Sequence, residues 1–382
     1  MTGPASSDVH LVHGMSMALE APTWPAITAD EARQILARFP AAGRLVAVHW
    51  HSPRPFSAAT LVETASGLFL LKRHHHRVRT PAALAEEHAF ILHLRAAGLA
   101  VPEVVTAADG ASVVAQGQWS YELHCKGIGI DLYRDRLSWT PFLSHHHAYQ
   151  AGVALARLHL AARGFTAAPR GPHPLVATFT ILPARDPIAA ADAYVAARPA
   201  LATFLTDTPW RTELARLFTS LGDGLSKRLE RQPPLWTHND WHPSNLLWSA
   251  DGRVTTIFDF GLSTRTCALH DLATAIERTA IPWLDLGEGR NSLPDAQAAL
   301  ALLAGYHSLV PLSRFDVETL VRLLPLVHIE FALSEVDYFA GILGDPDQAH
   351  MAWQTYLIDH VDWFLAPPGQ AFLRHMENGA ST

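Results

Sequence analysis

The residues best suited to chemistry lie in two short stretches, one running from His238 to Asn245 and one opening with Asp259. The chain between them contains two apolar or β-branched runs, separated by the pair Asp251-Gly252. Such a pair between such runs is typical of a two-residue hairpin turn. With that turn, Asn245 falls opposite Phe258, and the hairpin brings Asn245 close to Asp259, fourteen positions further along the chain.

This pairing has the chemistry of a metal-phosphate site. An amide oxygen and a carboxylate suit Mg²⁺, which takes its other ligands from water and from the phosphates of a nucleotide. Asp240 lies on the loop that enters the hairpin, where it is placed to accept a proton from an attacking hydroxyl. Taken alone, Asp240 has a simpler interpretation as a loop aspartate that makes an Asx turn.

Three motifs carry a resemblance to a known family: His238-Asn-Asp-Trp-His-Pro-Ser-Asn-Leu-Leu247, Ile257-Phe-Asp-Phe-Gly261 and Asp271-Leu-Ala273. They resemble motifs of the aminoglycoside phosphotransferase, choline kinase and type II homoserine kinase group, within the protein-kinase-like superfamily. The resemblance implies an α+β, two-lobed protein-kinase-like fold, with a small antiparallel-sheet N-terminal lobe and a large, mostly helical C-terminal lobe.

The resemblance also assigns roles around these motifs. It implies ATP and Mg²⁺ as cofactors, Asp240 as the catalytic base, and Asn245 and Asp259 as the Mg²⁺ ligands. Asp271 would brace the catalytic loop, and His238 would orient that loop rather than react.

Phosphate binding is expected in the N-terminal lobe. Three strand-like runs, at 44–50, 60–63 and 67–72, are followed by a helix over about 81–97. Lys72 ends the third run, where the superfamily places the lysine that pairs with the α- and β-phosphates. Glu87 lies on the apolar stripe of the helix and is the predicted partner of this lysine, with an exposed acidic first turn as the alternative.

Two further nucleotide contacts are expected. After strands near 112–115 and 119–123, the segment from Glu122 to His124 is predicted as the hinge, whose backbone groups bind adenine. The loop over 52–59 that covers the phosphates lacks glycine, unlike the loop of protein kinases. Ser57 is the candidate there to supply a hydroxyl, with an ordinary loop role as the alternative.

The acceptor site is predicted from one long helix over 322–343, in which Pro325 falls in the first turn. Polar stripes between apolar ones place Glu330 and Asp337 as tentative acceptor-binding residues. Carboxylates facing a cleft favour a cationic or polyhydroxylated acceptor, but they pair equally well with arginines of the chain itself. His242 and Trp283 are further tentative acceptor-binding residues.

Histidine-rich segments also suggest a metalloprotein. Consecutive histidines occur at 74–76 and 145–147, but neighbours in sequence do not point to one centre, so a solvated surface is the preferred interpretation. His159 is interpreted as a hydrogen-bonded core histidine.

Length and composition agree with an intracellular enzyme. The 382 residues, 49% of them hydrophobic and 17% charged, suffice for two lobes. The expected division is a flexible N-terminal arm at 1–25, where no periodicity is evident, a nucleotide-binding lobe at 26–124, a catalytic and acceptor-binding lobe at 125–366, and a C-terminal tail at 367–382. The formal charge of −7 argues against nucleic-acid binding. Two cysteines, with no signal or membrane-spanning segment, predict a cytoplasmic protein that does not bind a membrane.

The expected partners are ATP and a small hydroxylated acceptor, aminoglycoside-like, an amino alcohol or similar. Only eleven residues separate Asp259 from Asp271, too few for the long activation segment of protein kinases. Three alternatives stay open: a serine/threonine protein kinase of the stress-response type, a catalytically silent pseudokinase that serves as a binding module, and the histidine-bound metalloprotein. The sequence leaves the oligomeric state and a preference for GTP over ATP undetermined.

Overall fold

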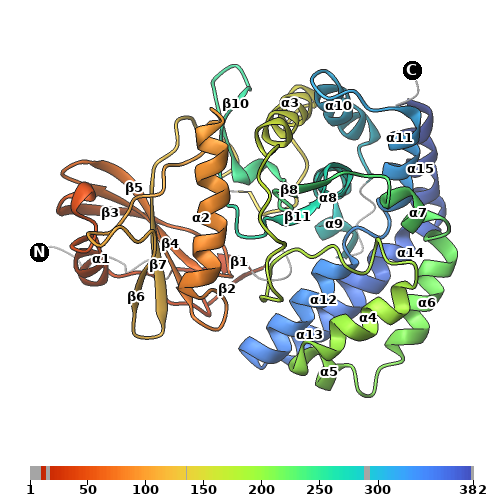
Figure 1. Ribbon diagram of the computed structural model, residues 1–382, viewed down its shortest axis with the longest axis horizontal. Coiled ribbons are helices and arrows are strands. Elements are labelled where there is room, and N and C mark those ends of the chain that lie inside the picture. The colour runs from red at the N-terminus through yellow and green to blue at the C-terminus, as the bar shows by residue number, and fades with distance from the viewer. Residues whose placement is uncertain (1–9, 14–17, 135, 288–292, 380–382) are drawn as a thin grey trace, which may run out of the picture. The chain divides into compact units, whose positions relative to one another are not determined.

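The computed structural model describes residues 10–13, 18–134, 136–287 and 293–379. The chain divides into two compact units (Figure 1). The N-terminal unit comprises residues 1–88 and 102–126, and the C-terminal unit comprises residues 89–101 and 127–382. The first is built on an antiparallel sheet and the second is mostly helical, so the predicted α+β class is confirmed.

The N-terminal unit contains a five-stranded antiparallel sheet in the order β3-β4-β5-β7-β6. Helix α1 begins after Thr28, whose hydroxyl accepts from the Glu31 backbone N–H, and buries Ile35 and Leu36 against the sheet residues Val62 and Leu71. The elements are α1 (Ala29–Leu36), β3 (Leu45–His51), β4 (Ala58–Thr64), β5 (Gly67–His75), β6 (Val114–Gln116) and β7 (Trp119–Cys125), with a 3₁₀ turn at Pro40–Ala42. Helix α2 (Pro81–Ala96) connects the two units in sequence.

Part of the segment expected to be an arm is structured. Residues Val12–His13 (β1) and Leu19–Glu20 (β2) pair as two short antiparallel strands. Val12 is buried, and the His13 backbone N–H donates to the Pro53 carbonyl. A single buried valine in a stretch without periodicity gives no recognisable pattern. Residues 1–9 and 14–17 of the expected arm lie outside the described chain.

The C-terminal unit holds the remaining elements. Its strands form two antiparallel pairs, β8 with β11 and β9 with β10. The strands are β8 (Pro234–Thr237), β9 (Leu246–Trp248), β10 (Val254–Ile257) and β11 (Thr264–Cys267). The first helices are α3 (His145–Ala161), α4 (Pro187–Ala196), α5 (Pro199–Phe204), α6 (Trp210–Leu221), α7 (Leu225–Leu229) and α8 (Ala268–Ala280). The later helices are α9 (Trp283–Gly287), α10 (Ala296–His307), α11 (Arg314–Leu323), α12 (Ile329–Asp337), α13 (Pro346–Met351), α14 (His360–Leu365) and α15 (Pro367–Gly379), with π-helical turns at Tyr338–Leu343 and Ala352–Asp359.

Helices α3 and α10 approach each other unusually closely, as Figure 1 shows at the top of the C-terminal unit. A Cβ on Gly152 would lie 2.0 Å from the Leu302 carbonyl oxygen, and one on Gly305 would lie 2.0 Å from the Tyr149 carbonyl oxygen. Both positions therefore require glycine, because any side chain would force the backbones apart. This close packing sets the position of His159 and Tyr306, one on each helix.

Two predicted elements were wrong. The helix expected over 322–343 is broken: α11 ends at Leu323 and α12 begins at Ile329, because Pro325 cannot continue the hydrogen-bonding pattern of a helix. The tail expected at 367–382 is instead helix α15 over most of its length, and it buries Phe372 and Met376. These two apolar residues are four apart, the spacing of one helix face, and this signal was available in the sequence.

Candidate active site

The hairpin that was expected to bring Asn245 and Asp259 together is present, with a different turn. The register is Leu246 to Ile257 and Leu247 to Thr256, and the Phe258 backbone N–H donates to the Asn245 carbonyl at 3.1 Å. Asn245 therefore lies opposite Phe258, as predicted.

The turn is one residue longer than the predicted Asp-Gly pair. The Ser249 backbone N–H donates to the Arg253 carbonyl, and Gly252 has a φ of 79°, which is typical of a three-residue loop with a left-handed glycine. The register shifts between Val254 and Thr256, so Thr255 forms a bulge that offsets the extra residue of the turn.

Two residues of the active-site loops have left-handed backbones. Asn239 and Asp259 both have a φ of 61°, a conformation that Asn and Asp tolerate better than most residues. His238 joins these loops: its Nε2–H donates to the Phe258 carbonyl at 3.0 Å, and its Nδ1 accepts from the Asp240 backbone N–H at 3.2 Å. Burial lowers the pKa of His238, which keeps the ring neutral in this tautomer. The expected role in orienting the loop agrees with these contacts.

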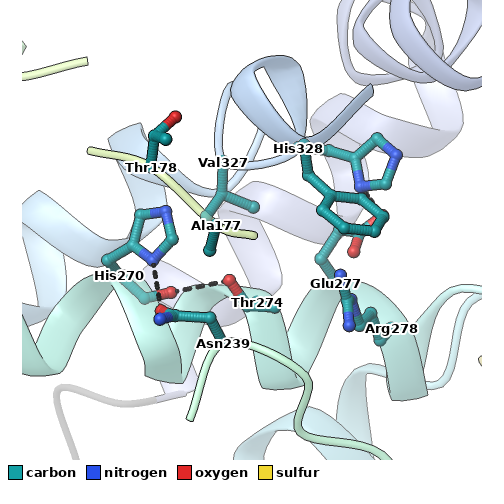
Figure 2. A pocket seen from close by; sticks show the side chains of 10 residues that line it. Ala177, Thr178, Asn239, His270, Thr274, Glu277, Arg278, Val327 and His328 are labelled. Carbon is teal, nitrogen blue, oxygen red and sulfur yellow. Dashed lines mark hydrogen bonds and ion pairs between the residues drawn. The ribbon is translucent and has the colours of Figure 1, made fainter. Parts of the chain in front are cut away.

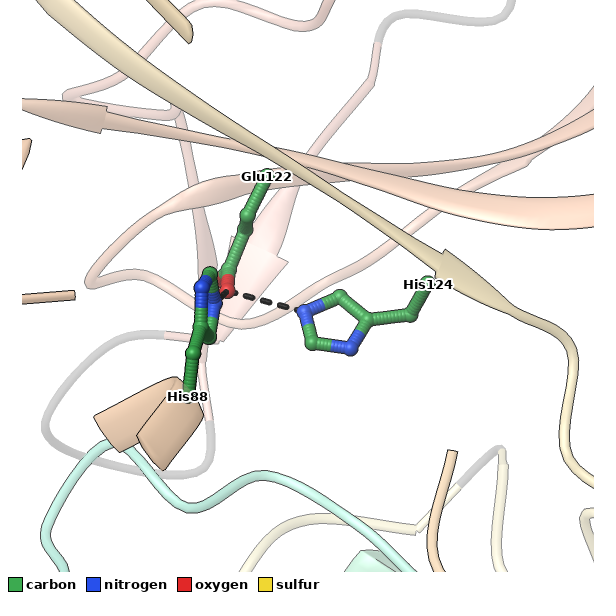
Figure 3. Close-up of side chains that lie close together, drawn as sticks. All are labelled: His88, Glu122 and His124. Atoms are coloured by element: carbon green, nitrogen blue, oxygen red, sulfur yellow. Dashed lines mark hydrogen bonds and ion pairs between the residues drawn. The ribbon is translucent and has the colours of Figure 1, made fainter. Parts of the chain in front are cut away.

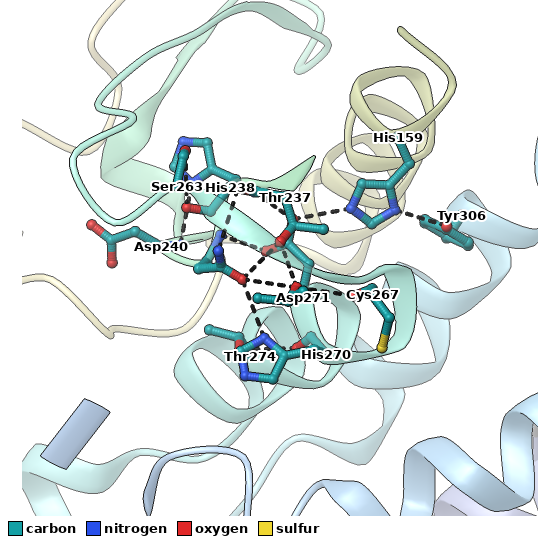
Figure 4. A network of polar contacts seen from close by, with 12 residues as sticks. His159, Thr237, His238, Asp240, Ser263, Cys267, His270, Asp271, Thr274 and Tyr306 are labelled. Carbon is teal, nitrogen blue, oxygen red and sulfur yellow. Dashed lines mark hydrogen bonds and ion pairs between the residues drawn. The ribbon is translucent and has the colours of Figure 1, made fainter. Parts of the chain in front are cut away.

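Asp271, in the first turn of α8, braces the catalytic loop (Figure 4). Its Oδ2 accepts from the backbone N–H of His238 at 2.8 Å, and its Oδ1 accepts from that of Asn239 at 2.7 Å. His159 Nε2 also donates to Oδ2, at 3.0 Å, and His159 Nδ1 lies 2.8 Å from the Tyr306 hydroxyl. Burial opposes the charge of Asp271, but these hydrogen bonds hold the pKa of the carboxyl below its ordinary value.

Asp240 has a cationic neighbour that sequence reasoning missed. Arg278 Nη1 forms an ion pair with Asp240 Oδ1, while Asn245 Nδ2 donates to Oδ2 at 3.0 Å. His242 Nε2 lies 3.5 Å from Oδ1, so His242 does lie beside the candidate base. Burial lowers the pKa of Arg278 to about 9. Arg278 follows Asp271 by seven residues on α8, two helical turns, and this spacing was a signal that both side chains leave the helix on the same side.

The residues expected to hold Mg²⁺ fit such an ion. The amide nitrogen of the Asn245 side chain donates to the backbone oxygen and to the carboxylate of Asp240. This arrangement directs the NH₂ group toward Asp240 and leaves the amide oxygen, a good Mg²⁺ ligand, for other contacts. Asp259 supplies a carboxylate two positions beyond Ile257, the residue paired with Leu246.

In the N-terminal unit, Lys72 lies beside Glu122. The two residues are directly opposed on strands β5 and β7, and Lys72 Nζ lies 3.6 Å from Glu122 Oε1. Three histidines complete the surroundings of this carboxylate: His74 Nε2 at 2.9 Å, His88 Nε2 at 2.7 Å and His124 Nε2 at 2.8 Å (Figure 3 shows the last two). Burial opposes the ionised form, yet Lys72 and His124 hold the pKa of Glu122 well below its ordinary value.

The expected place of the hinge was wrong. Glu122 and His124 lie within strand β7 rather than after it, and backbone groups of this segment already pair with neighbouring chain. The Leu123 carbonyl accepts from the Val105 N–H, and the Cys125 N–H donates to the Glu103 carbonyl. The boundary between the units falls between residues 126 and 127. Glu87 is buried in α2, and its role as partner of Lys72 stays a prediction, as does the phosphate contact of half-buried Ser57.

Three tentative acceptor residues have structural contacts instead. Glu330 accepts from the hydroxyls of Thr178 and Thr180 at 2.9 and 2.8 Å and from the Thr180 N–H at 2.7 Å. Asp337 accepts from the Leu201 N–H at 3.2 Å. Trp283 is buried and stacks on His360, with ring centroids 3.8 Å apart. These contacts give all three residues a structural role, and their part in acceptor binding stays a prediction.

A narrow pocket lies next to the catalytic loop (Figure 2). Its lining includes Asn239 of that loop and Arg278, the ion-pair partner of Asp240. Glu277, His328 and Phe331 also line it. The pocket therefore reaches the ion-pair partner of Asp240 from inside the C-terminal unit. Over the described residues, no helix has the length and apolar character needed to cross a membrane.

The chain combines a small antiparallel-sheet unit with a helical unit, and the helical unit holds a braced His-x-Asp loop and an Asp-Phe-Gly hairpin. Together these features define a protein-kinase-like phosphotransferase. The model of the phosphotransferase enzyme family (APH) matches residues 56–314. The chain therefore belongs to this family, whose members transfer a phosphoryl group to a hydroxyl.

Individual relatives agree with this assignment. The homoserine kinase of Azorhizobium caulinodans is 24% identical over 294 residues, covering 77% of this chain and 81% of the relative. A microcompartment-associated aminopropanol kinase has a similar structure, with a TM-score of 0.54 and 20% identity, covering 92% of this chain and 99% of the other. So does a mutant of the aminoglycoside phosphotransferase APH(4)-Ia in complex with AMP-PNP and hygromycin B, with a TM-score of 0.53, 15% identity, and coverage of 90% and 98%.

The assignment of Lys72 to phosphate binding gives a first prediction. Replacing Lys72 by Met removes the ammonium group and should weaken ATP binding about 10- to 100-fold, the size expected for one charge-assisted contact. Titration of the purified variant with ATP measures this loss. Lys227→Met, at an exposed position on α7, is the matched control and should bind ATP as the unaltered protein does. Equal affinities for the two variants would contradict the assignment.

Proposed function

We propose that the protein is an ATP- and Mg²⁺-dependent kinase that phosphorylates a hydroxyl group of a small molecule. The observation that carries the proposal is the braced loop: Asp271 holds the backbone of His238 and Asn239, and this fixes the adjacent Asp240 beside Asn245. Such an arrangement suits a reaction in which positioning and charge neutralisation supply most of the catalysis.

Each candidate residue would have a separate role in the reaction. Asp240 would orient the acceptor hydroxyl and receive its proton as the new P–O bond forms and the bond to the leaving ADP breaks. Arg278 pairs with this carboxylate and holds it in place before the acceptor arrives. Asn245 and Asp259 would hold Mg²⁺, which when bound neutralises charge on the phosphates. Lys72 would bind the outer phosphates.

A small acceptor is favoured by how little chain follows the Asp-Phe-Gly motif. Strand β11 begins at Thr264 and α8 begins at Ala268, so the eleven residues before Asp271 are largely committed to regular structure. No segment remains there to dock a peptide as protein kinases do. The homoserine, aminopropanol and aminoglycoside kinases among the relatives suggest a hydroxylated acceptor that carries an amine.

The test is Mg²⁺-dependent release of ADP from ATP in the presence of a panel of amino alcohols, hydroxy amino acids and aminoglycosides, with a basic protein as a separate arm. Turnover with one class of small acceptor is expected. Phosphorylation of the protein alone would favour the stress-response type of kinase instead. Binding of ATP without turnover in any arm would support the pseudokinase alternative.

A further inference from the structure

Four ionisable side chains meet inside the C-terminal unit at one end of the pocket that Asn239 and Arg278 line. They are Glu277 on α8, His328 just before α12, Glu335 on α12 and His360 at the start of α14. Each is at least nine-tenths buried. Glu277 and His328 also line the pocket, and Figure 2 shows them together, beside Arg278. Three elements far apart in the sequence, namely α8, α12 with its N-cap residue His328, and α14, thus bring carboxylate and imidazole groups together.

These side chains do not satisfy one another. Among the described residues, neither oxygen of Glu277 has a hydrogen-bond partner, and the same is true of Glu335 Oε2, His328 Nε2 and His360 Nδ1. His360 Nδ1 lies 3.6 Å and His328 Nδ1 lies 3.9 Å from Glu277 Oε1, beyond hydrogen-bond length. Buried polar atoms are nearly always paired, so five unpaired ones in a single cluster point to a missing partner.

The groups around these atoms in the described chain do not fill the cluster. The Trp283 ring stacks on His360, and Trp139 contacts His328 edge-on at 5.5 Å. Arg278, the cation whose charge acts on Glu335, has its Nη1 on Asp240. Burial, together with the charge of Glu335, raises the pKa of Glu277 to about 8 against the opposing effect of Trp283, and burial raises that of Glu335 to about 8. A cation bound among these side chains would stabilise the ionised carboxylates.

We propose that Glu277, His328 and His360 bind a divalent transition-metal ion of the Zn²⁺ class. One ligand atom of each residue lies within 4.8 Å of those of the other two. A tetrahedral ion with ligands at about 2.0–2.1 Å separates its ligand atoms by roughly 3.3 Å. The two measured separations, 3.6 and 3.9 Å, need only a small contraction to reach this value. Two imidazoles and one carboxylate suit zinc and its neighbours rather than Mg²⁺.

Glu335 lies behind His328, on the side away from the proposed ion, and would orient this histidine. His328 Nδ1 faces Glu277, while His328 Nε2 lies 3.9 Å from Glu335 Oε2. With Nδ1 on the ion, Nε2 carries the proton and donates it to Glu335, the arrangement by which carboxylates orient metal-binding histidines. An ammonium group of the acceptor would satisfy the carboxylates, but it would leave the imidazole nitrogens unused. His360, moreover, is not part of the pocket lining.

The second histidine cluster does not share these features. Around Glu122, the nitrogens of His74, His88 and His124 lie 2.7 to 2.9 Å from the carboxylate oxygens, which is hydrogen-bond length. Glu122 is thus already satisfied, and only His88 Nδ1 lacks a partner in the described chain. This cluster serves as the internal comparison for the experiment.

The experiment measures metal content and does not depend on kinase turnover. The full chain, freed of any purification tag and stripped with a chelator, is titrated with Zn²⁺, and with Co²⁺ as a spectroscopic probe. We expect one ion per chain, a higher midpoint of thermal unfolding, and Co²⁺ absorption of a four- or five-coordinate site. His328→Gln and His360→Gln should each weaken binding on the order of 100-fold or more, and Glu335→Gln about 10- to 100-fold.

The controls separate this site from others. His350→Gln, at an exposed position on α13, should bind the ion as the unaltered chain does. If the histidine variants do not fold, Glu277→Gln keeps the shape of the side chain and removes the anionic ligand. Absence of stoichiometric binding, or full affinity in the Glu277 variant, would overturn the proposal. So would loss of the ion in His88→Gln with retention in His360→Gln, since that result places the ion at Glu122.

Discussion

Asp240→Asn is expected to reduce kcat by about 10²- to 10⁴-fold, the range for removing a general base. The substitution keeps the size of the side chain but removes the negative charge that would receive the acceptor's proton. It also removes the partner of Arg278. ATP affinity should change little, because Asp240 is assigned to the acceptor and not to the nucleotide. Initial rates of ADP release, together with an ATP titration of the same sample, measure the two quantities separately.

Asp207→Asn is the matched control, since Asp207 is exposed and belongs to none of the site's contacts. It should retain full turnover. A value of kcat within threefold of the unaltered protein for Asp240→Asn would remove Asp240 from the mechanism. A fall in turnover that came with an equal fall in ATP affinity would point to a disturbed loop rather than to a missing base.

The second large effect concerns stability. Asp271→Ala removes a buried carboxylate that accepts from His159 and from the backbone of His238 and Asn239. Breaking such a buried charged network costs on the order of 3–5 kcal/mol of unfolding free energy. Chemical denaturation of the variant measures this loss, with exposed Asp223→Ala as the control, for which we expect no more than about 0.5 kcal/mol.

The contribution of Asp271 to the unfolding free energy should depend on pH in a defined direction. The folded-state pKa of Asp271 is depressed below its ordinary value of 3.8. Its contribution to stability is therefore fully present above that unfolded-state value, and it is lost as the pH falls through the lower folded-state pKa. The difference in unfolding free energy between the unaltered protein and Asp271→Asn should be constant near neutral pH and should shrink below about pH 4. A difference that grew on acidification would contradict the assigned ionisation.

The parts of the site that the sequence predicted are those fixed by local geometry. The hairpin between Asn245 and Asp259 follows from strand pairing over a short loop, and the predicted register was right. The turn itself was wrong by one residue, and the bulge at Thr255 offset the error. The helix that bears Glu87 was also predicted within one residue of its end, because its apolar stripe and flanking turns are local signals.

The parts that could not be predicted depend on contacts between distant segments. Glu122 meets Lys72 only because β7 pairs with β5, fifty residues earlier in the chain, and no local pattern specifies that partner. The hydrogen bonds of Glu330 with Thr178 and Thr180 join segments about 150 residues apart, and the helix pattern around Glu330 gave no sign of them. The cluster around Glu277 needs three separate elements, so its members look unrelated in the sequence.

The contact between α3 and α10 has a consequence for the stage of synthesis at which the active site can form. His159 reaches the loop brace, and Tyr306, 147 residues later, supports His159 from the other helix. During synthesis from the N-terminus, every catalytic and metal-binding candidate up to Asp271 emerges before Tyr306 does. A nascent chain of that length therefore holds these groups and Asp271, but not the Tyr306 hydroxyl that supports His159. We expect phosphoryl transfer only once α3 and α10 have met, so activity would report on assembly of the C-terminal unit.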